Sequence, residues 1–251
     1  MKNIIFSLLL VFAFSAQASI TIVSDLDDTI KITEAGGNAT DIIGDDVYTG
    51  MPEFLAAAKE YSPTLYVLSA SPSIMRSKIA STLKKRKVIY NGLVLRSNIT
   101  EGKFEYKVRE IKKLMEQSSD DFIFLGDDLG KDPEAYSEIA RQFPGRVLGI
   151  YIHVVNGRKI TSDSVPYWTS FDLTLREFEA SRMTPGWVEK IIDLLKSEAK
   201  LQYIFPKKAQ CPSEASVWEW QTRTIFMQEA QDLIERFTSF CQARQSDNIL
   251  L

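Results

Sequence analysis

The chain has 251 residues, of which 45% are hydrophobic, enough for the core of one α/β domain with an appendage. Its 30 lysines and arginines stand against 33 aspartates and glutamates, and the resulting formal net charge of −3 argues against general nucleic-acid binding. A single histidine and two cysteines argue against a dedicated zinc site.

Residues 1–18 predict a secretory signal peptide. Lys2 supplies the positive n-region, Ile4–Phe14 is a nearly unbroken apolar run, and Ala16-Gln17-Ala18 is a typical cleavage site. The apolar run is shorter than the roughly 20 residues that span a bilayer. We therefore expect an exported chain, periplasmic or secreted, that begins at Ser19 and has no transmembrane segment. An uncleaved N-terminal anchor is the alternative.

The first predicted strand, Ile20–Ser24, runs directly into Asp25-Leu26-Asp27-Asp28-Thr29. Two carboxylates two residues apart then lie at the carboxyl end of a strand, where open α/β sheets place their ligand sites. An acidic turn is the alternative for an isolated pair of this kind. The next segment, Thr33–Gly50, has turn chemistry at Ala35-Gly36-Gly37-Asn38 and predicts either a small flap or an ordinary surface loop.

Strands and helices then alternate, which is typical of a parallel sheet covered by helices on both faces. Further strands are expected at Thr64–Ser69, Gly92–Leu95, Phe122–Gly126 and Arg146–Ile152. Helices are expected at Pro52–Tyr61, Pro72–Lys87, Glu105–Gln117, Asp132–Phe143 and Pro185–Leu201. The predicted fold is α/β, a Rossmann-like three-layer sandwich with a mainly parallel five-stranded sheet, a small flap insertion and a C-terminal helical extension.

Residues 201–251 are expected to form that helical extension, after a domain that spans residues 19–200. Ser213 to Arg244 contains no Gly or Pro and predicts a single helix. Export would permit a disulfide between Cys211 and Cys241. A continuous helix, however, would separate their Cα atoms by about 40 Å, because each residue adds about 1.5 Å. A disulfide requires this helix to break, and both outcomes stay open.

Further polar side chains follow the second and fourth predicted strands. Ser69 closes the second strand, and Ser71 is placed as a helix N-cap with Pro72 at N1, an arrangement suited to an anion. Gly126-Asp127-Asp128 and Asp132 form a second acidic cluster after the fourth strand. Parallel strands bring both acidic clusters to one edge, where converging carboxylates need a cation. Oxygen ligands favour Mg²⁺ over Zn²⁺.

The order of these pieces resembles the haloacid dehalogenase-like superfamily of phosphotransferases. The resemblance rests on D-x-D-x-T at Asp25–Thr29, a hydrophobic strand ending in Ser69, Lys107, and G-D-x-x-x-x-D at Gly126–Asp132. Each motif alone is weak, but four in this order, each at the correct end of its element, are specific together.

A closer resemblance is to the phosphatidate phosphatase catalytic domain of the actin-patch-associated type, over roughly residues 20–155. Asp128 stands where that family usually has Ser, and His153 stands where it usually has Arg. The runs that carry the resemblance are Asp25–Lys31, Gly50–Pro52, Tyr66–Pro72, Phe122–Asp128, Lys131–Tyr136, Phe143–Pro144 and Ile150–Ile152.

The resemblance implies a phosphomonoester hydrolase that works through an aspartyl-phosphate. Asp25 would be the nucleophile, and Asp27 would protonate the leaving oxygen and then deprotonate the attacking water. Ser69 would donate a hydrogen bond to a phosphate oxygen. Lys107, which fits the family's K-x-x-x-I pattern, would hold Asp25 ionised, with Lys103 as the runner-up for this role.

The resemblance also implies Mg²⁺ as the cofactor. Asp25, the main-chain carbonyl of Asp27, and Asp127 would contact the ion, and either Asp132 or Asp128 would orient its water. The residues implied in substrate binding are Ser69, Ser71 and Lys107.

Phosphatidate or a related lipid phosphomonoester is the substrate that the resemblance favours. A phosphatase of small soluble phosphate esters and a catalytically inactive phosphate- or lipid-binding module are the alternatives. Lys84-Lys85-Arg86-Lys87 would suit peripheral contact with an anionic membrane, or would form a solvated helix end that complements the helix dipole. His153 would be a substrate contact or, more usually, an internal histidine.

Overall fold

A computed structural model of the protein describes residues 19–33, 44–206 and 225–248. The predicted signal peptide, the turn expected at Ala35–Asn38, and Cys211 lie outside the described residues, so these predictions stay predictions. No helix within the described ranges is both long enough and apolar enough to cross a membrane.

The described part of the chain contains one sheet of six parallel strands, in the order β3-β2-β1-β4-β5-β6. The first five lie where the sequence predicts them, but the sixth, an edge strand beside β5, corrects the expected count. It escaped prediction because it has only three residues and contains Pro166, which is typical of edges. The strands are β1 (Ile20–Ser24), β2 (Thr64–Pro72), β3 (Gly92–Arg96), β4 (Asp121–Asp127), β5 (Val147–His153) and β6 (Val165–Tyr167).

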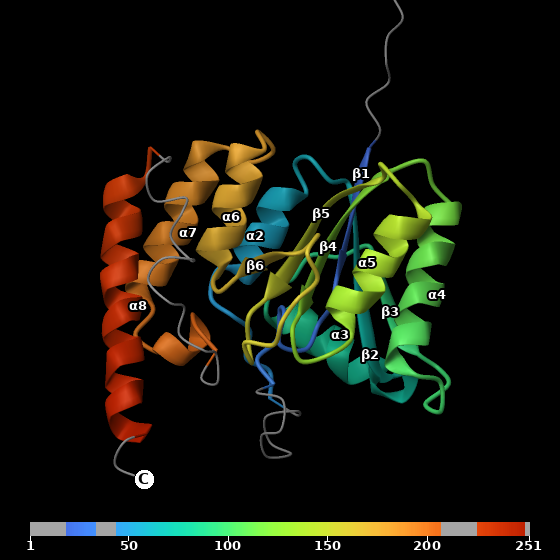
Figure 1. The fold of residues 1–251 in the computed structure, drawn as a ribbon, viewed down its shortest axis with the longest axis horizontal. Coiled ribbons are helices and arrows are strands. Elements are labelled where there is room, and N and C mark those ends of the chain that lie inside the picture. The colour runs from blue at the N-terminus through green and yellow to red at the C-terminus, as the bar shows by residue number, and fades with distance from the viewer. Residues whose placement is uncertain (1–18, 34–43, 207–224, 249–251) are drawn as a thin grey trace, which may run out of the picture.

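Helices cover both faces of this sheet, because successive side chains of each strand point to opposite faces. In β1, Ile22 belongs to the apolar core on one face and Val23 to the core on the other. The expected three-layer α/β sandwich is therefore confirmed (Figure 1). One face carries α4 (Lys103–Glu116) and α5 (Asp132–Gln142), and the other carries α2 (Met51–Ala58), α3 (Arg76–Lys85), α6 (Ser170–Glu179) and α7 (Pro185–Ser197).

Two helices differ from the prediction. The helix expected to begin at Pro72 begins later, because β2 continues through Pro72 and a 3-10 turn, η1 (Ser73–Met75), precedes α3. The helix α6 was not predicted at all, although Thr169 and Asp172 form a capping box at its start, a pattern that is visible in the sequence.

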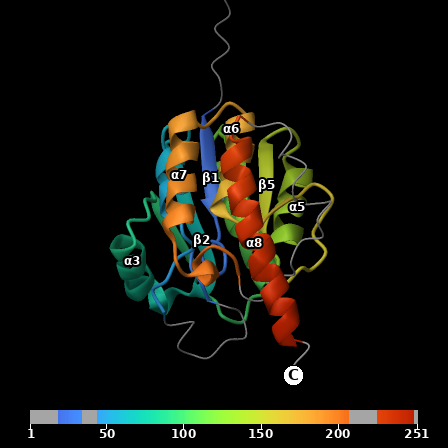
Figure 2. The same ribbon diagram turned by 90° about the vertical axis from the view of Figure 1, so that its left-hand side faces the viewer.

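The C-terminal helix α8 (Met227–Asn248) packs on the outer side of α7 (Figures 1 and 2). Arg236 of α8 donates a hydrogen bond to the main-chain oxygen of Leu195 at 2.6 Å, and Phe237 is buried in the core that α7 shares. The contact brings α8 onto the core of the preceding domain. The boundary expected at residue 200 stays a prediction.

Within the described residues, the single helix expected from Ser213 to Arg244 is confirmed from Met227 to Arg244 but starts later than predicted. Ile225 and Phe226 form a turn immediately before α8, so helix does not run through them. Ile225 is β-branched and exposed, and such residues favour helix less than straight-chain ones. Cys241, in α8, is disulfide-bonded, and the chain's other cysteine lies outside the described residues.

Candidate active site

The strand order places two of the predicted acidic residues side by side. It reverses at β1, which has β2 on one side and β4 on the other, and ligands of open α/β sheets bind at the carboxyl ends of strands at such a point. Asp25 follows β1 directly, and its N–H donates to the main-chain oxygen of Leu125 in β4 at 2.8 Å. Asp127 ends β4. The two acidic clusters therefore meet at one edge, as the sequence predicts.

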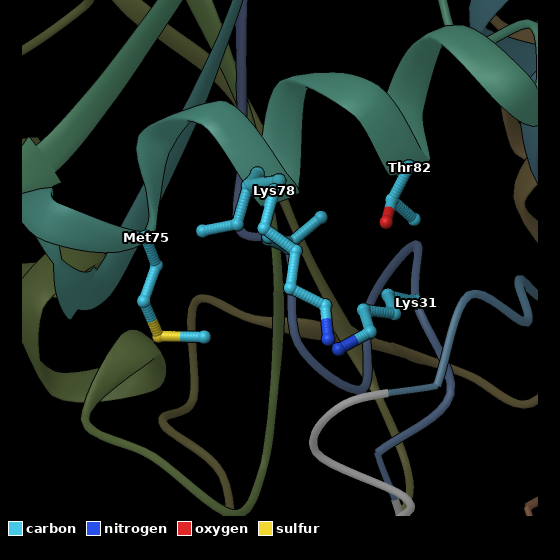
Figure 3. Close-up of a pocket in the computed structure, with 6 residues that line it drawn as sticks. Lys31, Met75, Lys78 and Thr82 are labelled. Carbon is cyan, nitrogen blue, oxygen red and sulfur yellow. The ribbon is translucent and has the colours of Figure 1, made fainter.

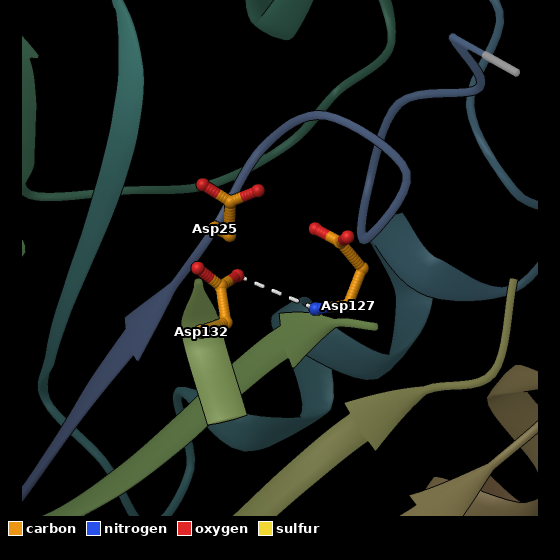
Figure 4. Close-up of side chains that lie close together, drawn as sticks. All are labelled: Asp25, Asp127 and Asp132. Carbon is orange, nitrogen blue, oxygen red and sulfur yellow. Dashed lines mark hydrogen bonds between the residues drawn. The ribbon is translucent and has the colours of Figure 1, made fainter. Parts of the chain in front are cut away.

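Three buried carboxylates converge there, from Asp25, Asp127 and Asp132 (Figure 4). One oxygen of each lies within 4.8 Å of the others. Asp132 begins α5, and its Oδ2 accepts a hydrogen bond from the N–H of Asp127 at 3.3 Å. Gly126 allows this approach, because a Cβ at that position would lie 2.5 Å from Asp132 Oδ2. The glycine of the G-D motif is thus required by packing.

Lys107 supplies the cation of the cluster. It lies in α4 with only 4% of its surface exposed, and its Nζ donates to Asp25 Oδ1 at 2.8 Å and also pairs with Asp132. Although burial disfavours its charge, the carboxylates of Asp132 and Asp25 raise the pKa of Lys107 above its ordinary value. Lys103, the runner-up, is exposed at the start of the same helix.

One lysine does not neutralise three carboxylates. Burial and the neighbouring Asp132 raise the pKa of Asp127 to about 7. Burial also raises the pKa of Asp25 well above its ordinary value, against the opposing charge of Lys107. The fully ionised cluster is therefore costly without a further cation.

The donor set fits Mg²⁺, which prefers carboxylate oxygens and retains several waters. Asp127 Oδ1 accepts hydrogen bonds from the N–H groups of Leu129 and Gly130, at 2.7 and 3.0 Å. Within the described ranges, neither Asp127 Oδ2 nor Asp25 Oδ2 accepts a hydrogen bond. These two oxygens are the ones left for an ion.

The side chain of Asp27 lies outside the cluster of three and has its own partners. Its Oδ2 accepts hydrogen bonds from the hydroxyls of Ser71 at 3.1 Å and Ser69 at 3.3 Å, and Lys31 Nζ is 3.9 Å from its Oδ1. The two serines, predicted as substrate contacts, here orient Asp27. Ser71 is not a helix N-cap, because η1 begins after Pro72 with no side-chain cap. Lys31 was not predicted as a site residue, although its place four residues after Asp27 is visible in the sequence.

Asp128, predicted as a metal-site residue, is not brought to the cluster of three carboxylates. Its carboxylate is fully buried, where Oδ1 accepts hydrogen bonds from the N–H groups of Val155 and Asn156, each at 2.9 Å. Its Oδ2 accepts one from the N–H of Arg158, also at 2.9 Å. Asp128 therefore fixes the loop that follows β5, while Asp132 is the residue that reaches the other carboxylates.

Replacing Asp128 with Ala should lower the free energy of unfolding by about 3 kcal/mol, because one buried and two part-buried N–H groups lose their acceptor. Urea unfolding at constant m-value measures this loss. Asp128→Asn keeps one acceptor oxygen and should cost less. If stability is unchanged and activity requires a higher Mg²⁺ concentration, Asp128 would instead belong to the metal site.

His153 is an internal histidine. Its Nδ1 lies 2.6 Å from the main-chain oxygen of Asp28, and its Nε2 lies 3.1 Å from that of Trp168. The ring stacks on Tyr167 with centroids 4.9 Å apart, and 2% of the residue is exposed. In this chain, the residue at the position where the family usually has Arg therefore packs in the interior. It has almost no exposed surface that a substrate could contact.

Comparisons with known proteins found a matching family model and distantly similar solved structures. The family model described as phosphatidate phosphatase APP1, catalytic domain, matches residues 20–154. Similar solved structures include the class C acid phosphatase from Bacillus anthracis with tungstate bound, at 15% identity and a TM-score of 0.36 over 74% of this chain and 82% of that chain. A second structure of that enzyme has 13% identity with the same TM-score and coverage. Both structural likenesses are distant, and no curated protein matches the chain.

Proposed function

The chain belongs to the family of the phosphatidate phosphatase APP1 catalytic domain, and on this premise we propose that it is a Mg²⁺-dependent phosphatase of lipid phosphomonoesters that works through an aspartyl-phosphate. The coarser activity, that of a phosphoric monoester hydrolase, is the activity of the family. The observation that carries the proposal is the position of Asp25, which contacts the ammonium of Lys107 and lies beside Asp127 and Asp132.

Asp25 is the nucleophile in this proposal. One of its carboxylate oxygens attacks phosphorus, the bond between phosphorus and the ester oxygen breaks, and an aspartyl-phosphate remains. Lys107 stabilises the ionised carboxylate before the attack and the phosphoryl charge after it. Burial alone would keep Asp25 protonated, so the reaction depends on positive charge at this edge of the sheet.

Asp27 moves the proton in both steps. It donates a proton to the leaving oxygen, and it then takes one from the water that attacks the aspartyl-phosphate and releases phosphate. The hydroxyls of Ser69 and Ser71 hold its carboxylate in place for this role. Ser69 is also the proposed donor to a phosphate oxygen once the substrate is bound.

Mg²⁺, when bound, would supply positive charge against the phosphoryl oxygens. Asp25 and Asp127 would hold it with the main-chain carbonyl of Asp27. Asp132 would not contact the ion directly, because its two oxygens are already engaged by Lys107 and by the N–H of Asp127. It would instead orient the groups that surround the ion.

A lipid substrate is supported by two exposed isoleucines at the same edge of the sheet. Ile74, in η1, is 91% exposed and lies three residues after Ser71, and Ile99 is 66% exposed in the segment after β3. The ends of β2 and β3 are paired, so both residues follow strands that end at the same edge of the sheet as the site, and there they would enter a lipid surface.

The basic run Lys84–Lys87 supports peripheral membrane contact less well. Lys85 Nζ pairs with Asp45 at 2.8 Å, and Arg86 pairs with Asp46 at 2.5 Å, at the C-terminal end of α3. Half of the run thus holds a neighbouring loop of the same chain. We propose instead that the membrane contact lies at Ile74 and Ile99.

Phosphate release from phosphatidate micelles and from 4-nitrophenyl phosphate, each with Mg²⁺ or with EDTA, tests the proposal. Release from phosphatidate is expected with Mg²⁺, and EDTA should lower it by about 100-fold or more. Release from the soluble ester alone would favour a phosphatase of small soluble esters. Full activity in EDTA would contradict the metal dependence, and no release from any ester would favour a binding module.

We also propose export through residues 1–18, which lie outside the described residues. The expected result is a protein recovered outside the cytoplasm whose first residue is Ser19, read by N-terminal sequencing. Recovery in the cytoplasm with Met1 retained would contradict this part of the proposal.

A further inference from the structure

The position of Asp27 depends on a tight turn of the chain around it. The main-chain oxygen of Leu26 accepts hydrogen bonds from the N–H groups of Ile30 and Lys31, at 3.0 and 2.8 Å. The N–H of Asp28 donates to the main-chain oxygen of Lys31 at 2.7 Å, and Asp28 adopts a left-handed conformation with φ of 57°, which Asp tolerates better than most residues. The geometry of the turn is therefore set by where the backbone of Lys31 lies.

A second piece of chain, residues 45–49, fixes the backbone of Lys31, and we call it the linking segment. Lys31 forms an antiparallel bridge with Val47. The N–H of Ile32 donates to the main-chain oxygen of Asp46 at 2.9 Å. A shift of the linking segment would therefore move the turn as well.

The helix α3 provides one set of contacts to the linking segment. Thr82 Oγ1 donates to Asp45 Oδ1 at 2.6 Å, and Arg86 pairs with Asp46 at 2.5 Å. The same helix packs against the loop that carries Lys31, since Thr82 and Lys31 line one small pocket (Figure 3). The pocket has a volume of about 10 Å³, room for about one water, so the helix and the loop are closely packed.

The C-terminal part of the chain provides a second set of contacts. The main-chain oxygen of Tyr203 accepts a hydrogen bond from the N–H of Thr49 at 2.7 Å, and the hydroxyl of Tyr203 donates to Asp46 Oδ2 at 3.1 Å. Glu198 Oε2 accepts a hydrogen bond from the hydroxyl of Thr49 at 3.0 Å. Both Glu198 and Tyr203 lie beyond residue 154, where the family match ends.

The helix α8 determines where Glu198 lies. Its Arg236 donates hydrogen bonds to the main-chain oxygens of Leu195 and Lys196, at 2.6 and 3.1 Å, and also to that of Glu198. These oxygens lie at the C-terminal end of α7, where the helix itself offers them no donor. The N–H of Lys200 donates to Glu198 Oε1 at 2.9 Å and orients the carboxylate. The C-terminal helix is therefore connected to the turn at the active site.

We propose that Glu198 and Tyr203 are positioning residues for Asp27. They act through the linking segment rather than on the substrate. An acid must lie within hydrogen-bond reach of the oxygen that it protonates, so a small displacement of Asp27 slows proton transfer. The inference rests on the proposed phosphomonoesterase activity and assigns the C-terminal part of the chain a role in it.

Two kinds of leaving group test this role in Glu198→Ala and Tyr203→Phe. Asp27 must protonate the alcohol that leaves phosphatidate, but 4-nitrophenolate leaves without a proton. In each variant, kcat/KM for phosphatidate should fall by roughly tenfold, and kcat/KM for 4-nitrophenyl phosphate should change by less than about twofold. Propyl phosphate, which also releases an alcohol, is assayed in parallel, so the test does not depend on a lipid substrate. A merely structural defect would lower the values for all esters by the same factor, and that result, or no fall for any ester, would overturn the inference.

Two further variants serve as the rescue and the matched control. Glu198→Gln keeps an oxygen that can accept the hydrogen bond from Thr49, so it should restore most of the lost kcat/KM for phosphatidate. Glu189 is an exposed glutamate of α7, and Glu189→Ala should leave the values for both kinds of ester unchanged. A fall in Glu189→Ala as large as that in Glu198→Ala would count against the proposed role of Glu198.

Hydrogen exchange provides a readout that does not need turnover. Mass spectrometry of a peptide that covers residues 26–33 should show roughly tenfold faster amide exchange in Glu198→Ala and Tyr203→Phe, and no change in Glu189→Ala. Unchanged exchange in the first two variants would overturn the inference even in an inactive protein. Faster exchange in a protein that releases phosphate from no ester would instead refute the proposed activity alone.

Discussion

Replacing Asp25 with Asn is expected to reduce phosphate release from every substrate by a factor of about 10⁴ or more. The amide has the shape of the carboxylate but no negative charge, so it cannot attack phosphorus. The fold should persist, because the change removes a buried charge whose pKa is already raised by burial. Phosphate release measures the loss, and circular dichroism with urea unfolding verifies that the variant is folded.

Asp27→Asn is the matched control, since it removes a carboxylate two residues away without removing the nucleophile. With 4-nitrophenyl phosphate, whose leaving group needs no proton, Asp27→Asn should still form the aspartyl-phosphate but hydrolyse it slowly. Mass spectrometry should therefore find one added phosphoryl group on Asp27→Asn and none on Asp25→Asn. Wild-type turnover by Asp25→Asn would show that the nucleophile is another residue.

Much of the fold was predictable because burial leaves a strong pattern in the sequence. The strands β1 and β4 are buried on both faces, so their apolar runs are continuous and bounded by polar residues. The strand β6 has three residues and a proline, too little for a pattern. The late start of α3 was missed because Ser71-Pro72 satisfies the rules of a helix start, while pairing with β3 holds Pro72 in the sheet.

The site was predictable where a strand end fixes the position of a side chain. Asp25 and Asp127 are placed by β1 and β4, and Lys107 by one face of α4, so sequence order and sheet topology determine their meeting. Asp128 and Asp132 could not be told apart in the same way. Which of the two reaches the cluster depends on the turn after β4, and the N–H groups that donate to Asp128 come from a distant loop that begins with Val155, 27 residues later.

Replacing Lys107 with Met is expected to give the other large loss, in both activity and stability. Phosphate release should fall by about 10³-fold, because the donor that contacts Asp25 is removed from a buried site. The free energy of unfolding should fall by about 3–5 kcal/mol, because Asp25 and Asp132 lose the cation of a buried ion pair. Urea unfolding in EDTA measures the stability without a contribution from bound metal.

The pH dependence of the free energy of unfolding distinguishes loss of the Lys107 cation from a packing defect. The pKa of Asp127, about 7 in the folded protein, lies above its ordinary value of 3.8, so between these values the folded state binds more protons than the unfolded state. Stability therefore falls as pH rises through this window. The charge of Lys107 lowers the pKa values of Asp25 and Asp127, and its removal raises them further.

The stability difference between Lys107→Met and wild type should consequently be small near pH 5 and grow toward about pH 8. A packing defect would give a difference that is independent of pH. Lys103→Met is the matched control, because Lys103 is exposed on the same helix and should change neither stability nor turnover. Loss of activity in Lys103→Met with activity retained in Lys107→Met would assign the cationic role to Lys103, against the contact of Lys107 Nζ with Asp25.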